Sequence, residues 1–325
     1  MKIVKQSCDV ISGLKPMEHI EKIGRICYKS EDKIEEGTAA KFIAMLFNNK
    51  HFAMLEHYRF IMEVSPVIYE PLSMLNLKHF ELTYDSEMSR YLISFNPTAL
   101  MNMVEDSHCE DYGILPMAIA GIRDELIGHI VRTYGCYELF GVNPDKFIPL
   151  STGVCFIPNS PDQMSEHEWN RHGWRSVHFV TDRGITHELV RHREETSFAQ
   201  ESTRYCNYGA GKFGCEITFV DQGFDDISTR KAWEEACEFA ENCYLNLLGD
   251  YDVSPQFARS VLPTCTKAEI VITAPIYEWN HIINLRYYGT TGKPHPMVKE
   301  LVTPLVESEI FAYKPYIEEE GRCDE

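Results

Sequence analysis

The sequence lacks long apolar runs and has few basic residues for its length. No run approaches the ~18 apolar residues of a membrane helix, and the N-terminal MKIVKQSCDV lacks the apolar core of a secretory signal. Lys and Arg number 31 against 49 Asp and Glu, a net charge of −18. Because nucleic-acid binders present a broad basic surface, this balance argues against one. We expect a cytoplasmic protein with no membrane partner and no nucleic-acid partner.

Several local motifs are also absent. The sequence has no P-loop, and we expect no Rossmann fingerprint, so side chains must hold any nucleotide. The 11 cysteines show no C-x-x-C spacing and are interpreted as reduced thiols. In HELVRH the histidines, His187 and His192, are five residues apart rather than the four that a zinc peptidase needs, so we expect no metal. Cys206 follows the basic stretch, so a cysteine nucleophile stays possible, although the sequence does not distinguish any one thiol from the others.

The periodicity of apolar residues outlines the elements. It predicts helices over Pro16–Tyr28 and Thr38–Asn48, a strand over Tyr58–Val64 and a helix after Pro296. Strands are also predicted in CEITFV and VLPTCTKAEIVIT, and a strand running into a helix is predicted in RYLISFNPTALMNM. Three further helices are predicted: one from Pro116 to Gly135, a long one capped by Ser228, and one leading into Arg286. Residues 66–175 fit an insertion into the main domain, and a separate second domain stays open.

A basic stretch, Arg191-His192-Arg193, follows a mostly apolar segment. Adjacent charges point in different directions, which suits an element end that grips an anion from several sides. Ser202 and Arg204 follow and could both donate to phosphate oxygens. Arg259 and Arg286 lie in otherwise apolar segments and are further candidates, although an ion pair with one of the 49 acidic residues would explain each equally well.

These motifs together resemble the flavin-dependent thymidylate synthases. RHR, a short spacer and S-x-R-Y resemble the family signature. HFAMLEH, residues 51–57, resembles its upstream H-x-[ST]-x-[FL]-E-H element. ARSVLP and NLR, between Ala258 and Arg286, resemble its downstream pair of nucleotide-binding arginines. The three ordered motifs cover roughly residues 1–64 and 176–300.

The resemblance implies an α+β fold with a mixed or antiparallel sheet and long helices, like that of the thymidylate synthase complementing proteins. It implies a single domain over residues 1–325 with an insertion at about 66–175, assembled as a homotetramer with shared active sites. The implied reaction is reductive methylation of dUMP to dTMP. FAD is the implied cofactor, and NADPH and methylenetetrahydrofolate are the implied co-substrates. No cysteine nucleophile is needed.

The resemblance also implies roles for individual residues. Arg286 would be catalytic, because a fixed cation at the uracil edge favours the ionised base. Arg259 would reach dUMP from another subunit. The implied dUMP-binding residues are Glu188, Arg191, Gln200, Glu201, Ser202, Arg204, Arg259 and Arg286. The implied FAD-binding residues are His51, Arg191, His192, Arg193 and His281.

The sequence departs from the family pattern at a few positions. The spacer between RHR and Ser202 has eight residues instead of seven, and the extra one lies within 194–196. Gln200 stands where many members have Glu, and Ala53 replaces a small hydroxyl residue. Two alternatives therefore stay open: the same fold binding a nucleotide or flavin without methyl transfer, or a methyltransferase acting on another pyrimidine nucleotide.

Overall fold

The structure is a computed structural model that describes residues 1–73, 76–105, 124–133, 154–204 and 206–308. Its centre is a four-stranded antiparallel sheet in the order β2-β7-β10-β8. The two inner strands pair along their whole length, from Trp174 opposite Pro275 to Asp182 opposite Lys267. The strands are β2 (Ser7–Ile11), β7 (Trp174–Asp182), β8 (Ser197–Gln200) and β10 (Lys267–Pro275).

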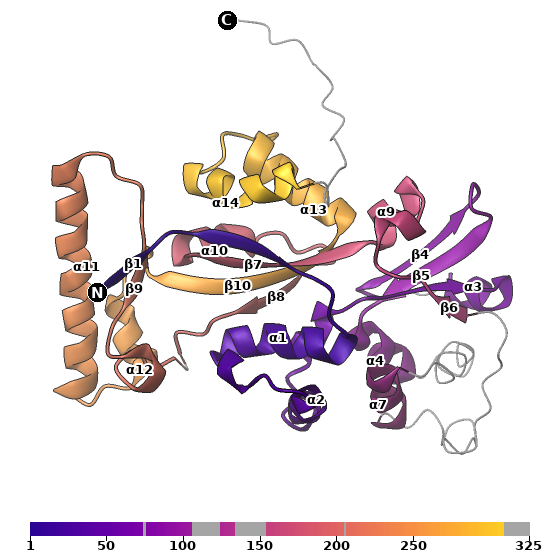
Figure 1. The fold of residues 1–325 in the computed structure, drawn as a ribbon, viewed down its shortest axis with the longest axis horizontal. Helices are drawn as coiled ribbons and strands as arrows, with labels where there is room; N and C mark the ends of the chain where they lie inside the picture. The colour runs from indigo at the N-terminus through magenta and orange to yellow at the C-terminus, as the bar shows by residue number, and fades with distance from the viewer. Residues whose placement is uncertain (74–75, 106–123, 134–153, 205, 309–325) are drawn as a thin grey trace, which may run out of the picture.

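Helices cover both faces of this central sheet (Figure 1). Successive side chains of a strand point to opposite faces, so Val271 packs with α1 while Ile270 and Ile272 pack on the other side with α13 and α14. The first face carries α1 (Pro16–Tyr28), α2 (Thr38–Asn48) and the 3₁₀ helix η2 (Phe52–His57). The second carries α10 (Arg183–Leu189), α13 (Ile276–Ile283) and α14 (Pro296–Glu307).

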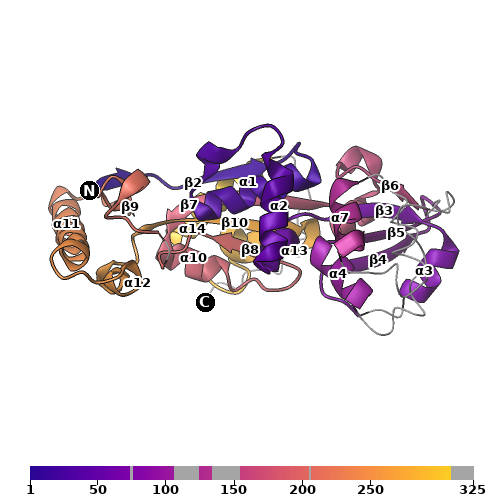
Figure 2. The ribbon, with the colours of Figure 1, turned by 90° about the horizontal axis from the view of Figure 1, so that it is seen from below.

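A second antiparallel sheet, in the order β4-β5-β3-β6, lies at one end of the molecule (Figure 2). Its strands are β3 (Phe60–Val64), β4 (Phe80–Asp85), β5 (Arg90–Phe95) and β6 (Val154–Phe156). Its helices are α3 (Pro66–Leu72), α4 (Pro97–Glu105), α7 (Glu125–Thr133) and α9 (Glu166–His172). Residues 66–175 thus supply three of its strands, but its core includes Ile20 of α1 and Phe42 of α2. The single domain with an insertion stays a prediction.

The opposite end holds the long helix α11 (Ile227–Gly249) and a parallel pair of strands, β1 (Lys2–Val4) and β9 (Thr218–Val220) (Figures 1 and 2). None of the helices in the described ranges is long and apolar enough to cross a membrane. The short helices are η1 (Glu31–Lys33), η4 (Pro161–Gln163), η5 (Gly211–Phe213), α12 (Pro255–Ala258), η6 (Arg259–Val261) and the π-helix η7 (Asn284–Tyr288).

The two antiparallel sheets with long helices confirm the α+β prediction. Helices α1, α2 and α14 begin where the periodicity placed them, while β10 begins at Lys267, later than predicted. The predicted cap of the long helix is wrong. Asp226 caps α11 in place of Ser228, because the Asp226 carboxylate accepts from the Thr229 amide at 2.7 Å. The predicted helix ends at Pro116 and Gly135 lie outside the described residues.

Candidate active site

The basic stretch lies where α10 ends, as the sequence predicts. Asp182, the last residue of β7, caps α10 by accepting from the Ile185 amide at 2.7 Å. Beyond Leu189 the chain turns, and the Arg191 and His192 amides reach back to the carbonyl oxygens of Glu188 and Leu189 at 3.3 Å each. The turn exposes Arg191 and Arg193 and buries His192, which is 5% exposed. One short turn therefore offers two exposed cations on either side of a buried imidazole.

Arg286 ties this turn to the π-helix η7. Its Nε donates to His192 Nε2 at 3.0 Å, its Nη1 to the Glu188 carboxylate at 3.0 Å, and its Nη2 to the Glu188 carbonyl oxygen at 2.9 Å. Because His192 Nε2 accepts, the ring proton belongs on Nδ1. Burial and the nearby Arg286 charge lower the pKa of His192 to about 4. The imidazole is therefore neutral at pH 7, and three of the predicted site residues form one cluster.

His281 joins this cluster from α13. Its ring lies edge-on to His192, with centroids 5.8 Å apart, and Glu278 lies close enough that ligand atoms of the three residues fall within 4.8 Å of one another. These distances alone would suit a metal ion. The Arg286 guanidinium bonded to His192 nevertheless places a fixed positive charge there, and this charge repels a cation. The cluster is better suited to a polar organic ligand.

Glu278 is a residue that the sequence prediction missed. Its side chain is 3% exposed, and burial, followed by the charges of Glu194 and Glu195, raises its pKa to about 7. A carboxyl whose pKa lies near neutrality is a frequent feature of functional sites. The available signal was its place in an apolar helix three residues before His281, because residues three apart share a helical face.

A second group of predicted residues forms at the end of β8. The Ser202 hydroxyl accepts from the Arg204 amide at 3.3 Å, and Arg259 Nη1 donates to the Thr203 hydroxyl at 3.1 Å. Both arginines are exposed. The Arg259 contact lies within one chain, so it gives no support to a contribution from another subunit. The Arg259 guanidinium and the hydroxyls of Ser202 and Thr203 thus lie within one short segment that also carries Arg204, and such groups suit a phosphate.

The side chains of Gln200 and Glu201 point to different parts of the structure. Gln200 Nε2 donates to the Thr186 hydroxyl at 2.8 Å, which links β8 to α10. The Glu201 side chain turns inward and is 2% exposed. Its carboxylate accepts from the Tyr208 hydroxyl at 3.0 Å and lies 3.2 Å from Lys267 Nζ. Glu201 thus belongs to a buried ion-pair network and is not grouped with Ser202.

The HFAMLEH segment packs against the spacer. The Ser197 hydroxyl of β8 donates to the Glu56 carbonyl oxygen of η2 at 3.3 Å. His51 lies at the start of η2, exposed, with Nδ1 3.0 Å from the Tyr28 hydroxyl. The structure therefore brings the upstream motif beside the basic stretch, although His51 itself contacts Tyr28 rather than the Arg286 cluster.

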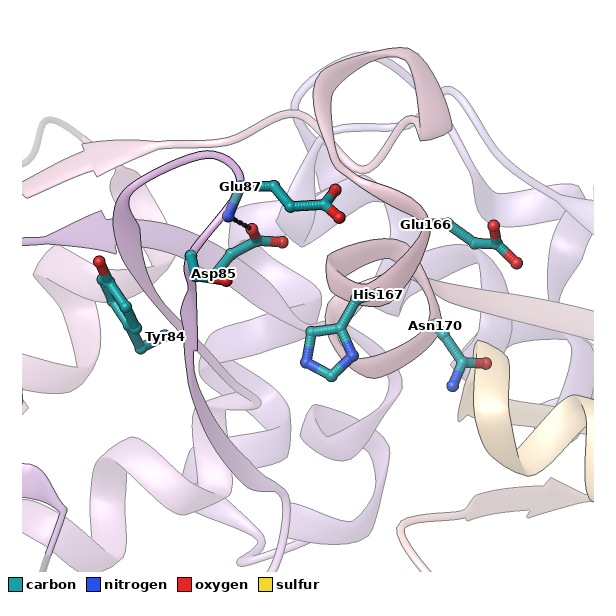
Figure 3. A pocket seen from close by; sticks show the side chains of 7 residues that line it. Tyr84, Asp85, Glu87, Glu166, His167 and Asn170 are labelled. Atoms are coloured by element: carbon teal, nitrogen blue, oxygen red, sulfur yellow. Dashed lines mark hydrogen bonds between the residues drawn. The ribbon is translucent and has the colours of Figure 1, made fainter.

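Two cavities lie away from these residues. One, of about 550 Å³, lies between the β4–β5 turn and α9, and its walls include Tyr84, Asp85, Glu87, Glu166, His167 and Asn170 (Figure 3). The Asp85 carboxylate there accepts from the amides of Glu87 and Met88 at 2.8 and 3.0 Å, so it organises the turn. The other, of about 750 Å³, lies between α1, α2 and the start of α7. None of the predicted site residues lines either cavity.

The spacing G-x-G-x-x-G does occur in the sequence, at Gly209, Gly211 and Gly214. In a dinucleotide-binding fold these glycines follow a strand and open a helix. Here they surround the 3₁₀ turn η5, and β9 comes next along the chain. The glycines therefore do not form a Rossmann fingerprint, and the expectation of side-chain binding is unchanged.

The fold and these contacts define an α+β protein in which a buried imidazole, bonded to a half-buried arginine and carboxylate, adjoins exposed arginines suited to an anionic ligand. Residues 170–295 match the family model described as thymidylate synthase complementing protein. The flavin-dependent thymidylate synthases of Corynebacterium glutamicum and Mycobacterium tuberculosis are 35% and 32% identical to the chain over 118 and 119 residues. Residues 170–295 of the chain are therefore similar to the thymidylate synthase complementing proteins.

The matches are partial. Each of these two alignments covers 32% of this chain and 45% of the relative, so the chain spans less than half the length of the curated relatives it matches. Among solved structures, a UMP/dUMP methylase PolB from Streptomyces cacaoi bound with 5-Br dUMP has a TM-score of 0.38 at 13% identity, covering 94% of this chain and 90% of that one. Thymidylate Synthase X from Helicobacter pylori with FAD and dUMP has a TM-score of 0.32 at 18% identity, covering 41% and 65%. At such TM-scores these likenesses carry no argument.

Proposed function

We propose that the chain catalyses the reductive methylation of dUMP to dTMP with FAD as cofactor and with NADPH and methylenetetrahydrofolate as co-substrates. The observation that carries the proposal is the cluster of Arg286, His192 and Glu188, which joins the RHR and NLR motifs of the family at one place. The match of residues 170–295 to the thymidylate synthase complementing protein model supports the same reaction. Bound FAD would supply the redox chemistry and the transfer of the one-carbon unit.

The residues at the turn after α10 fit FAD. Arg191 and Arg193 are exposed and can donate to a pyrophosphate, while the neutral imidazole of His192 offers a polar contact without a charge. His281, next to His192, extends the same surface. His51 is proposed to reach FAD from η2. These groups bind and orient the cofactor.

The dUMP phosphate is proposed to bind where Ser202, Arg204 and Arg259 meet. Gln200 and Glu188, and Arg191 from the turn, complete the proposed nucleotide contacts, and Glu201 acts through the ion-pair network beneath them. Arg286 is proposed to bind the uracil edge and favour its ionised form, since a fixed cation stabilises developing negative charge. Glu188 holds two edges of the guanidinium group, which keeps its plane fixed before substrate binds.

We further propose a homotetramer with shared active sites. The proposed FAD and dUMP groups, among them Arg193, Arg204 and Arg259, lie on the surface of one chain. A second copy laid over them would enclose the ligands. Sedimentation analysis of purified protein should give a tetramer of the 37.5 kDa chain, and a monomer with full activity would contradict shared sites.

A cytoplasmic location is proposed from cysteine usage. Seven of the described cysteines are free thiols, and three of these, Cys27, Cys237 and Cys265, are buried; the seven are Cys8, Cys27, Cys155, Cys215, Cys237, Cys243 and Cys265. Free thiols persist where the compartment is reducing. Alkylation of the denatured protein without prior reduction, with the added alkyl groups counted by mass spectrometry, measures how many cysteines are reduced.

The central experiment measures turnover. Purified protein should be yellow, oxidise NADPH faster when dUMP is added, and form dTMP when methylenetetrahydrofolate is present. Growth of a thymidine auxotroph without thymidine tests the whole reaction in cells. Protein that does not bind added FAD would contradict the proposal. Binding without dTMP formation would favour a non-catalytic member, and turnover with another pyrimidine nucleotide would favour the other alternative.

A further inference from the structure

The eight-residue spacer contains an unusual backbone position. Glu195 has φ +49°, in the left-handed region that residues with a side chain seldom adopt. His79, at the start of β4 in the second sheet, also has a left-handed φ, +62°. The two residues face each other, since the His79 amide donates to the Glu195 carboxylate at 2.7 Å. A strained conformation persists only where surrounding contacts hold it.

The contacts of Glu195 are those of a buried ion-pair cluster. Arg59, just before β3, donates through Nη1 to the Glu195 carboxylate at 2.9 Å, and His79 Nδ1 lies 3.4 Å from the same carboxylate. Arg59 and His79 are each 3% exposed. His79 Nε2 lies 3.5 Å from the carboxylate of Glu56 on η2. Two acids and two bases thus join the spacer, the second sheet and the HFAMLEH segment.

The Glu195 carboxylate is ionised, which strengthens its contacts with Arg59 and His79. Burial alone would raise the pKa of Glu195, but hydrogen bonds from His79 and the charge of Arg59 outweigh it and lower the pKa to about 2. Glu195 is therefore ionised at pH 7. Charge-assisted hydrogen bonds of this kind are stronger than neutral ones, and here they are shielded from water.

We propose that Glu195 is a positioning residue that fixes the turn of Arg191, His192 and Arg193 against the second sheet through Arg59 and His79. Glu195 lies two residues beyond Arg193, within the segment that holds the extra residue of the spacer. The chain between them is too short for the turn to move independently of the Glu195 contact. The additional residue of the spacer and the inserted segment then act together, because His79, which binds Glu195, belongs to the insertion.

The adjacent Glu194 provides a matched control. It is exposed, whereas Glu195 is bound within the cluster. Glu194→Gln and Glu195→Gln remove the same charge one residue apart, so a general electrostatic effect on the acidic surface would be shared by both variants. A positioning effect would belong to Glu195→Gln alone.

The first test uses hydrogen exchange of the backbone amides of residues 191–196 and needs no flavin. The Glu195→Gln variant should exchange there about tenfold faster than the wild type. The Glu194→Gln variant should match the wild type. Equal protection in both variants would overturn the proposal.

The second test measures FAD affinity and rests on the proposed function. Glu195→Gln should raise the dissociation constant about tenfold, since a mobile turn must be ordered on binding, and Glu194→Gln should leave it unchanged. Deletion of Glu195 restores a seven-residue spacer and should weaken FAD binding at least as much. A deletion variant that binds FAD like the wild type would contradict the proposal. If the wild type binds no FAD, the proposed function fails while hydrogen exchange still decides the role of Glu195.

Discussion

At the scale of single residues, the site depends on an imidazole that stays neutral beside a guanidinium group. His192 accepts from Arg286 through Nε2, and this contact is available only while that nitrogen is unprotonated. A protonated His192 would place a buried cation in contact with the Arg286 guanidinium. Burial and Arg286 therefore fix both the charge and the tautomer of the ring.

Replacing Arg286 by Lys should lower dTMP formation by ~100-fold or more. Lysine keeps the charge but cannot donate at once to His192 and to both the carboxylate and the backbone carbonyl oxygen of Glu188, so the cation is no longer held in one place. Steady-state rates with dUMP measure the effect. Arg230→Lys on α11, where the side chain is 43% exposed, should leave the rate unchanged. If the Arg286→Lys variant turned over at the wild-type rate, Arg286 would not have the proposed catalytic role.

Glu278→Gln should stabilise the protein increasingly as pH rises. The folded-state pKa of Glu278 is raised from 4.5 to about 7, so the stability linked to its protonation is present below pH 4.5 and is lost between pH 4.5 and 7. The loss is about 1.4 kcal/mol per pH unit within that window. Glutamine does not ionise, so the Glu278→Gln variant keeps its stability across this window. Thermal unfolding at pH 5 and pH 8 should show a gain for Glu278→Gln that is larger at pH 8.

The exposed Glu238→Gln serves as the control for this comparison. Its difference from the wild type should be small and should not grow with pH. A constant gain for Glu278→Gln across the pH range would mean that the carboxyl titrates at its ordinary value in the folded protein.

At the scale of elements, α10 is the helix that organises the site. It begins at the end of β7, the second strand of the central sheet, and it ends at the basic turn. Thr186 receives the hydrogen bond from Gln200, and Glu188 holds Arg286. Its seven residues therefore connect β7, β8 and η7, so the start of this helix matters for the placement of the turn.

Asp182→Ala should lower the free energy of unfolding by about 1 kcal/mol and should also weaken FAD binding. The variant removes the carboxylate that accepts from the Ile185 amide, and a lost N-cap frays the first turn of a helix. Asp226→Ala removes the corresponding cap of α11, the long helix at one end of the molecule (Figure 1). It should reduce stability without changing FAD affinity. Urea unfolding and flavin titration of both variants separate the two effects, and equal FAD affinities would show that α10 does not set the turn.

At the scale of the whole molecule, buried histidines are spread over both sheets. Among the described residues, burial lowers the pKa of His19 and His172 to about 3 and that of His57 and His192 to about 4, with nearby positive charges adding to the effect for His172 and His192. His19, Ser176, Thr273 and His57 form one hydrogen-bonded chain between α1, the central sheet and η2. His172 joins Thr83 and Ser94 of the second sheet.

The four histidines should therefore make the protein less stable as pH falls from about 6.5 toward 4, and together they outweigh the opposite effect of the single carboxyl of Glu278. Each histidine is neutral when folded but binds a proton when unfolded below pH 6.5, so the unfolded state gains protons first. The slope is about 1.4 kcal/mol per pH unit for each histidine that stays neutral. Melting temperatures between pH 7.5 and 4.5 measure it. A flat profile across this range would mean that these histidines titrate alike in the folded and unfolded chain.

Local patterns in the sequence determined many of the elements. Apolar periodicity placed α1, α2 and α14, and three adjacent charges marked the turn after α10, because both signals depend only on near neighbours along the chain. The cap at Asp226 was missed because Ser228 lies only two residues away, and backbone geometry decides which side chain accepts from the Thr229 amide.

Only the tertiary structure decided which residues meet. Arg286 reaches Glu188 and His192 across about a hundred residues of sequence, and Glu195 reaches Arg59 and His79 at a similar separation. Glu201 and Ser202 are adjacent in sequence, yet one turns into a lysine network while the other stays beside Arg204. Side-chain direction and long-range pairing follow from how the two sheets and their helices pack, and no short window of sequence contains that information.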